Sequence, residues 1–259
     1  MATFHDSMMI RLKGNVLDTK LSIVIPAYNE ALRIGRTLDR IGDYLKEFGY
    51  SAEIIVVDDG SHDDTEKVVR NAAEKFPFIV LLQNGMNKGK GYSVKRGVLS
   101  SGGRFVLMSD ADLSTPIVEI EKLFKELENG YDIAVGSRSV SGSKILKRQT
   151  WYRQLMGKTF NKIVQVVAVS GIRDTQCGFK LFKGDAARTV FARQRIERFA
   201  FDVEALYLAK KMGLRIREVP VVWVNSPDSK VSIFRDSLQM LWDILKIRFY
   251  HSSLGRGKV

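Results

Sequence analysis

Short apolar runs alternate with amphipathic stretches through the first half of the chain. The apolar runs predict strands, and the stretches between them, with apolar positions three and four residues apart, predict helices. Strands that are apolar throughout are typical of a parallel sheet covered on both faces. The fold class is therefore α/β, with a Rossmann-like, mostly parallel sheet flanked by helices. The predicted strands are 21–25, 53–57, 78–82, 104–108 and 133–136, and the predicted helices are 31–48, 64–75, 92–99 and one opened by Pro116.

The second half of the chain is less regular. Residues 151–169 mix apolar and basic positions in a helical pattern, and "DTQCGFKLF" (174–182) predicts a loop that enters a strand. A helix over 201–212 and a strand over 219–224 follow. The last predicted helix, 233–250, carries an apolar stripe that suits core packing or a position on a bilayer surface, beside the apolar residues of 151–156. The stripe consists of Phe234, Leu238, Leu241, Trp242, Leu245 and Phe249.

Composition limits the class of protein. The chain has 259 residues, no apolar run that approaches the roughly 18 to 20 residues needed to cross a bilayer, and one cysteine, Cys177, which suits a reducing compartment. Its formal net charge of +12 fits an anionic partner such as nucleic acid, anionic lipid or a phosphorylated small molecule. The charge is concentrated, because residues 138–173 contain bases and no acid.

Polar motifs follow the predicted strands at the point where each strand ends. "PAYNE" (26–30) follows the first strand, "DDGS" (58–61) the second, "NGMNKGKG" (84–91) the third and "SDAD" (109–112) the fourth. In parallel sheets, ligands bind beyond the carboxyl ends of the strands. We therefore expect these four motifs to meet in one site.

Asp110 and Asp112 are separated by a single residue at a strand end. Unpaired carboxylates this close would raise each other's pKa, and a divalent cation removes that cost. Magnesium and manganese take one or two carboxylates and fill their remaining positions with phosphate oxygens and water. The sequence predicts a Mg²⁺ or Mn²⁺ site at Asp110 and Asp112. The alternative is a pair of exposed acids, one of which caps the helix after Pro116.

Lys88 and Lys90 lie in a glycine-rich loop that leads into a helix. Backbone N–H groups and two ammonium groups would form an anion site there. The loop lacks the P-loop spacing, and no dinucleotide glycine pattern follows the first strand, which disfavours a nucleotide hydrolase and a dehydrogenase. Asp58 could accept hydrogen bonds from a ribose or a base, and Gly60 permits a tight turn. Together the motifs describe a nucleoside-diphosphate pocket with a metal at the diphosphate.

These motifs resemble those of a known family. "LSIVIPAYNE", "EIIVVDDGSHDDT", "NKGKGYSVKRG" and "MSDADLSTP" look like family 2 glycosyltransferases of GT-A fold. "VGSR", "GIRDTQCGFKLF", "RFAFDVEALYLA" and "EVPVVWVNSPDSKV" resemble the dolichyl-phosphate β-glucosyltransferase branch of the polyprenyl-phosphate glycosyltransferases. The resemblance covers about residues 20 to 248. It implies that the nucleotide sugar is bound by Pro26, Ala27, Tyr28, Glu30, Asp58, Gly60, Lys88, Lys90, Asp110, Ala111 and Asp112.

The implied reaction is the inverting transfer of a hexose to a polyprenyl phosphate. Glucose from UDP-glucose is the first choice, and GDP-mannose and UDP-N-acetylglucosamine are the alternative donors. The lipid phosphate is largely ionised at neutral pH, because its second pKa is about 6, so the site needs positive charge more than a strong base. Five bases are expected to bind that phosphate, unless they form only a solvated basic face: Arg138, Lys144, Lys147, Arg148 and Arg153.

Four acids and one base receive further roles. Asp112, Asp174 and Arg138 are the catalytic candidates, and Asp174 is expected to orient the acceptor or a basic partner. Asp202 and Glu204 stand at a helix start, where they would contact sugar hydroxyls or favour the helix dipole.

The domain organisation follows from these assignments. Residues 1–19 form a loose leader, residues 20–232 the GT-A domain, and residues 233–259 a C-terminal amphipathic helix with a basic tail. The nucleotide-sugar half spans about 20–137 and the acceptor half about 138–232. The expected partners are a nucleotide sugar, a polyprenyl phosphate and the membrane surface, with the protein cytoplasmic and peripheral at the inner membrane face.

Two other classes of protein stay open at this stage. A nucleotidyltransferase would also use metal-binding acids in an α/β fold, but it would release diphosphate. A basic nucleic-acid-binding module would explain the net charge, although the acidic strand ends would repel a phosphate backbone. We expect no nucleic acid partner.

Overall fold

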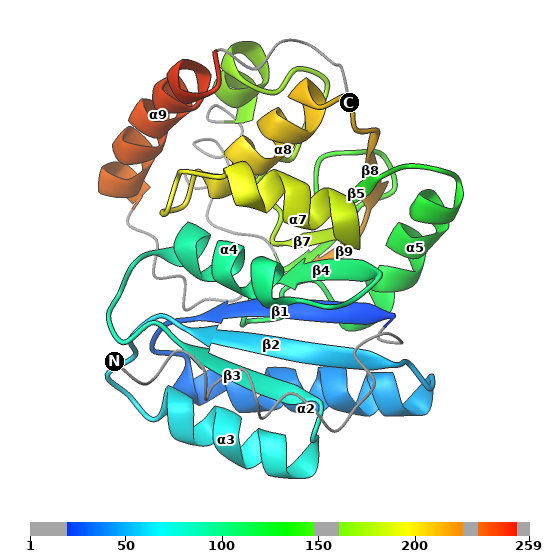
Figure 1. Ribbon diagram of the computed structural model, residues 1–259. Helices are drawn as coiled ribbons and strands as arrows, with labels where there is room; N and C mark the ends of the chain where they lie inside the picture. The colour runs from blue at the N-terminus through cyan, green and yellow to red at the C-terminus, as the bar shows by residue number, and fades with distance from the viewer. Residues whose placement is uncertain (1–19, 148–160, 225–232, 253–259) are drawn as a thin grey trace.

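A seven-stranded sheet forms the centre of the molecule in the computed structural model, which describes residues 20–147, 161–224 and 233–252 (Figure 1). The strand order is β3-β2-β1-β4-β7-β5-β8. Neighbouring strands are parallel except at β7, which is antiparallel to both β4 and β5. The strands are β1 (Leu21–Ala27), β2 (Ala52–Asp58), β3 (Ile79–Gln83), β4 (Phe105–Ser109), β5 (Ile133–Ser137), β7 (Phe179–Lys183) and β8 (Ile216–Pro220).

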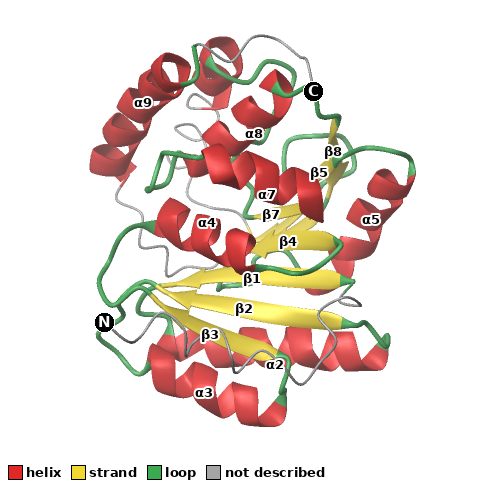
Figure 2. Ribbon diagram, viewed as in Figure 1, coloured by secondary structure: helices red, strands yellow, loops and turns green. Residues whose placement is uncertain are grey.

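Helices cover both faces of this sheet (Figure 2). Alternate strand residues point to opposite faces, so Ile23 of β1 packs in one apolar cluster and Val24 in the other. The cluster of Ile23 includes residues of α2 (Ala31–Glu47), α3 (Thr65–Lys75), the 3₁₀ turn η2 (Ile117–Glu119) and α5 (Ile120–Glu128). The cluster of Val24 includes residues of α4 (Lys90–Ser100), α7 (Gly184–Arg193), α8 (Phe201–Lys211) and α9 (Ile233–Tyr250). The predicted α/β fold is confirmed.

Three features of the second half differ from the sequence prediction. The strand predicted over 219–224 is two strands, β8 and β9 (Val222–Val224), because the pairing with β5 ends where Ser137 meets Pro220, and the residues that follow pair with another strand. β9 pairs with β6 (Lys144–Lys147) in a separate two-stranded sheet. Helix α7 was not predicted, since two of its four buried residues are the small Gly184 and Ala187, which weaken the apolar pattern.

Part of the prediction lies outside the described residues. These parts are the leader over 1–19, the first ten residues of the helix predicted over 151–169, and the tail after residue 252. Residues 161–167 are helical, and α9 has the predicted bounds. None of the helices in the described part of the chain is both long and apolar enough to cross a membrane.

Candidate active site

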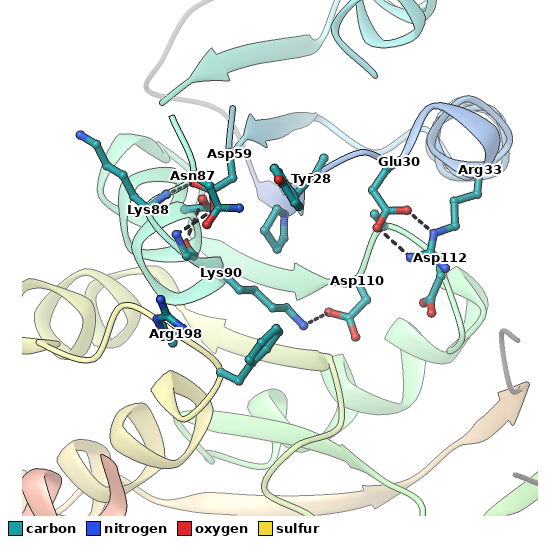
Figure 3. Close-up of a pocket in the computed structure, with 16 residues that line it drawn as sticks. Tyr28, Glu30, Arg33, Asp59, Asn87, Lys88, Lys90, Asp110, Asp112 and Arg198 are labelled. Atoms are coloured by element: carbon teal, nitrogen blue, oxygen red, sulfur yellow. Dashed lines mark hydrogen bonds and ion pairs between the residues drawn. The ribbon is translucent and has the colours of Figure 1, made fainter. Parts of the chain in front are cut away.

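A cavity of about 350 Å³ opens at the carboxyl ends of β1 and β4, beside the first turn of α4 (Figure 3). Figure 3 shows Lys90 reaching towards Asp110, with Asp112 and Arg33 on one side and Lys88 and Arg198 on the other. The lining residues are Pro26, Ala27, Tyr28, Glu30, Arg33, Asp59, Asn87, Lys88, Gly89, Lys90, Ser93, Asp110, Ala111, Asp112, Arg198 and Phe199. Residues of all four motifs that follow the strands line this cavity, and the second motif contributes Asp59.

The two acids after β4, Asp110 and Asp112, both line this cavity but have different hydrogen-bond partners. Asp110 accepts a hydrogen bond from Lys90 Nζ at 2.6 Å, and its carboxylate rests on the Gly178 backbone, where an added Cβ would lie 1.9 Å from Oδ2. Asp112 Oδ1 accepts a hydrogen bond from Ser114 N at 3.0 Å. Burial and the charge of Asp110 raise the pKa of Asp112. Burial acts to lower the pKa of Lys90, but Asp110 and Asp202 outweigh it and raise that pKa.

This pair of carboxylates fits a divalent cation. Burial and then the negative charge of Asp110 raise the pKa of Asp112, and a doubly charged ion bound at the two carboxylates would favour their ionised forms. The described residues contain no cluster of three or more His, Cys, Asp or Glu side chains able to hold a metal. Asp110 and Asp112 could therefore supply two ligands, and diphosphate oxygens and water would supply the others, as Mg²⁺ and Mn²⁺ accept.

Asp59 holds the glycine-rich loop in place. Its carboxylate accepts hydrogen bonds from Lys88 N at 3.0 Å, Gly89 N at 2.8 Å and Asn84 Nδ2 at 2.7 Å. These two backbone N–H groups are thus taken by Asp59. The Lys90 side chain reaches into the cavity to Asp110, whereas Lys88 Nζ lies 3.3 Å from Tyr92 Oη and points away from the two acids. The backbone of Gly89 has φ of +106°, which explains the glycine.

Asp58 and Gly60 shape the turn after β2 and do not line the cavity. Asp58 is 3% exposed and accepts hydrogen bonds from the backbone and hydroxyl groups of Ser61. Gly60 has φ of +72°, and an added Cβ would lie 2.6 Å from the Met86 backbone. The residue of this motif that reaches the cavity is Asp59, which the sequence analysis passed over although it stands next to Asp58.

The other lining residues that the sequence analysis missed come from three places. Arg33 lies three residues after Glu30, one helical turn along, and forms an ion pair with it. Asn87 and Gly89 flank Lys88 in the loop, and Ser93 follows in the first turn of α4. Arg198 and Phe199 come from the segment before α8, and no local pattern in the sequence connects that segment with the donor motifs.

Arg138 and Asp174 form an ion pair beyond the cavity. Asp174 is fully buried and accepts hydrogen bonds from Arg138 Nε at 2.7 Å, Nη2 at 2.8 Å and backbone N at 2.8 Å. Burial acts to raise the pKa of Asp174, but the Arg138 guanidinium holds it below its usual range. The guanidinium also lies 5.3 Å from the Trp223 ring centre. Asp174 therefore contacts Arg138, and its predicted role of orienting the acceptor or a basic partner stays a prediction.

The remaining acceptor candidates lie on or beyond β6. Lys144 is exposed there, and its neighbour Ile145 stands opposite Trp223 of β9, so β6 adjoins the Arg138 pair. Lys147 ends the same strand. Arg148 and Arg153 lie outside the described residues.

Asp202 and Glu204 are buried on α8 and do not line the cavity. Asp202 pairs with the fully buried Lys180, and its charge also acts on Lys90. Burial raises the pKa of Asp202, against the opposing effect of Lys180. Glu204 bonds to backbone N–H groups of the segment before α8. These contacts account for both carboxylates without a sugar. Cys177 is also buried, which raises the pKa of its thiol to about 11.

Comparisons with known proteins show the family of the chain. The model of the family described as glycosyl transferase family 2 matches residues 22–191. A dolichyl-phosphate β-glucosyltransferase of Dictyostelium discoideum is 42% identical over 253 residues, which cover 93% of this chain and 77% of that one. The dolichyl-phosphate β-glucosyltransferase of Homo sapiens is 39% identical over 245 residues, covering 88% and 75%.

The fold also matches solved structures. Glucosyl-3-phosphoglycerate synthase from Mycobacterium tuberculosis, in complex with Mn²⁺, uridine diphosphate and glucosyl-3-phosphoglycerate, superposes with a TM-score of 0.65 at 18% sequence identity. The match covers 89% of this chain and 80% of that chain. The central sheet and its flanking helices are those of the GT-A fold. With the family model and the curated relatives, this shows that the chain is a glycosyltransferase and belongs to glycosyl transferase family 2.

Proposed function

We propose that the protein transfers glucose from UDP-glucose to a dolichyl-type polyprenyl phosphate with inversion, giving polyprenyl-phosphate β-glucose. The observation that carries the proposal is the cavity that joins Asp110 and Asp112 to Lys88 and Lys90, in a chain 42% identical to a dolichyl-phosphate β-glucosyltransferase. As a glycosyltransferase, the chain is neither of the other two classes that the sequence left open. GDP-mannose and UDP-N-acetylglucosamine remain the alternative donors.

The donor side of the mechanism rests on charge. Mg²⁺ or Mn²⁺ held by Asp110 and Asp112 would supply positive charge to the departing diphosphate. Lys88 and Lys90 line the same cavity and would stabilise the charge that grows there as the bond from the sugar C1 to the diphosphate oxygen breaks. Tyr28 and the strand end before it form the wall against which the nucleoside would lie.

The acceptor side of the mechanism needs a positively charged side chain that binds the lipid phosphate. An oxygen of the ionised lipid phosphate forms the new bond to C1 from the opposite face, and UDP leaves with the electron pair of the broken bond. Arg138 would hold that phosphate, because Asp174 fixes its guanidinium in one orientation and Trp223 supports it from the side. Lys144 on the adjoining β6 would add positive charge to the approach.

Transfer can be measured directly. Purified protein with Mg²⁺ or Mn²⁺, dolichyl phosphate and UDP-[¹⁴C]glucose should place label in the organic phase, and excess EDTA should reduce that label to background. GDP-[¹⁴C]mannose and UDP-N-acetyl[¹⁴C]glucosamine serve as matched donors and should give less product. Label from one of these two donors alone would correct the sugar, and no transfer from any donor would refute the proposal.

We also propose that the protein is cytoplasmic and docks on the inner face of the membrane through α9 and the helical residues 161–167. The apolar residues of α9 lie on two sides: Ile244 and Ile247 are buried against the domain, whereas Trp242 and Phe249 of the predicted stripe are 59% and 79% exposed. Arg248 donates a hydrogen bond to Val167 O, which joins the two helices. Exposed apolar and basic side chains on one pair of helices suit an anionic bilayer, where the lipid acceptor resides.

Flotation with liposomes tests this surface. We expect wild type to float with vesicles that contain anionic phospholipid, and the double variant Trp242→Ser/Phe249→Ser to float at least about tenfold less. Leu99→Ser, which removes a 45% exposed leucine from α4, is the matched control and should float like wild type. Equal flotation of the double variant would exclude α9 as the docking surface.

A further inference from the structure

Glu204 is a fully buried carboxylate that joins α8 and the segment before it to the distant C-terminal end of α9. It lies in the first turn of α8 and accepts hydrogen bonds from Arg195 N at 3.0 Å and Ile196 N at 2.7 Å. Its Oε1 also lies 2.6 Å from Nε2 of His251, which is 3% exposed and directly follows α9. The end of the C-terminal helix is thus tied by a short polar contact to the segment before α8.

That segment forms part of the cavity wall and packs on the glycine-rich loop. Glu197 O accepts a hydrogen bond from Tyr92 N at 3.0 Å. An added Cβ at Gly89 would lie 2.4 Å from Glu197 O, and one at Gly91 would lie 2.5 Å from Ile196 O, so the two backbones are in direct contact. The same segment supplies Arg198 and Phe199 to the cavity.

Side-chain contacts strengthen the connection at both ends. Gln194 Nε2 donates hydrogen bonds to Gly91 O at 3.0 Å and to Ile196 O at 2.7 Å. Near α9, the Arg195 guanidinium lies 5.5 Å from the Tyr250 ring centre, and the Tyr207 and His251 rings lie 6.4 Å apart. A shift of the C-terminal end of α9 would therefore move His251 and, through Glu204, the segment 194–199. That segment is the part of the cavity wall that carries Arg198.

We propose that Glu204 and His251 are positioning residues that couple the end of α9 to the donor cavity. Their contact sets the place of the segment 194–199, and through it the place of Arg198, Phe199 and the loop of Lys88 and Lys90. The proposal rests on the proposed function, in that the cavity is taken as the donor site. It replaces the sugar contact expected for Glu204 and gives α9 a second role beside that of a surface helix.

Hydrogen exchange of the full-length protein tests the coupling without reference to any substrate. In His251→Ala we expect amide exchange to rise about tenfold in peptides over 194–200 and about threefold over 87–92. His251→Gln should restore wild-type exchange, because its amide can donate to Glu204 from a similar place. Ser252→Ala, which changes an exposed neighbour at the same helix end, should leave both peptides unchanged.

Donor kinetics give the second measurement. We expect His251→Ala to raise KM for UDP-glucose about fivefold with kcat within about twofold of wild type, and His251→Gln to restore KM. Unchanged exchange over 87–92 in His251→Ala would overturn the coupling, as would a His251→Gln variant no better than His251→Ala. A wild-type protein that does not use UDP-glucose would instead contradict the proposed function, and the exchange result would still decide the coupling.

Discussion

Replacing Asp112 by asparagine is expected to lower the rate of glucose transfer by about 10²- to 10³-fold, the range found when a group that stabilises developing charge is removed. The amide keeps the size of Asp112 and can still accept the hydrogen bond from Ser114 N, so the turn after β4 should persist. What it loses is one of the two carboxylate ligands of the proposed metal. Initial rates with dolichyl phosphate at saturating Mg²⁺ measure the effect.

The same substitution should not destabilise the metal-free protein. The pKa of Asp112 is raised in the folded state, first by burial and then by Asp110. The folded state therefore prefers the protonated carboxyl. Below the unfolded pKa of about 3.9 the carboxyl is protonated in both states and does not oppose folding, whereas above the folded pKa it must be ionised in an unfavourable place. At neutral pH the charge of Asp112 therefore lowers the free energy of unfolding. Chemical denaturation should therefore give Asp112→Asn an unfolding free energy at least equal to that of wild type, with the difference shrinking below about pH 4.

A matched control separates the local effect from a general one. Asp185→Asn changes an acid on α7 whose side chain is fully exposed, and should leave transfer and stability unchanged. If Asp112→Asn lost activity together with stability, the loss would reflect unfolding, and near-normal transfer would remove Asp112 from the site.

The donor half of the site could be predicted because its information is local. Strand direction within a βαβ unit is fixed by the chain, so the carboxyl ends of β1, β2 and β4 had to share an edge. The motifs that follow those strands could then be placed in one site before their contacts were known. Asp59 was missed because two adjacent carboxylates at a strand end point in different directions, and the sequence does not say which of them faces the cavity.

The acceptor half could be predicted only in part. β7 enters the sheet antiparallel between β4 and β5, and no residue in "GFKLF" signals the direction of a strand. That insertion brings Gly178 against Asp110 and Lys180 against Asp202. The buried role of Asp202 depends on Lys180, and that of Glu204 depends on His251 and on the segment before α8. At the level of sequence both acids are simply favourable residues in the first turn of a helix.

Substitutions in the Arg138–Asp174 pair should separate its contribution to stability from its contribution to glucose transfer. Asp174→Leu leaves the partly buried guanidinium of Arg138 without its partner, and Arg138→Met leaves the buried Asp174 carboxylate without its own. Breaking a buried pair from one side costs about 3 to 5 kcal/mol, so we expect each single variant to lower the free energy of unfolding by about 3 kcal/mol. Urea denaturation at pH 7 gives this value. Lys75→Met, which breaks an exposed pair with Asp39, should change it by less than about 1 kcal/mol.

The double variant Arg138→Met/Asp174→Leu distinguishes structure from function. Apolar side chains of similar size often replace a buried ion pair without loss of stability, so the double variant should regain most of what either single variant loses. It will not regain all of it, because the Arg138 backbone N–H loses its acceptor. Transfer should remain about 10²-fold below wild type, since no guanidinium is left to hold the acceptor phosphate. Recovery of both stability and transfer would mean that the pair serves only the fold, and that the phosphate is bound elsewhere.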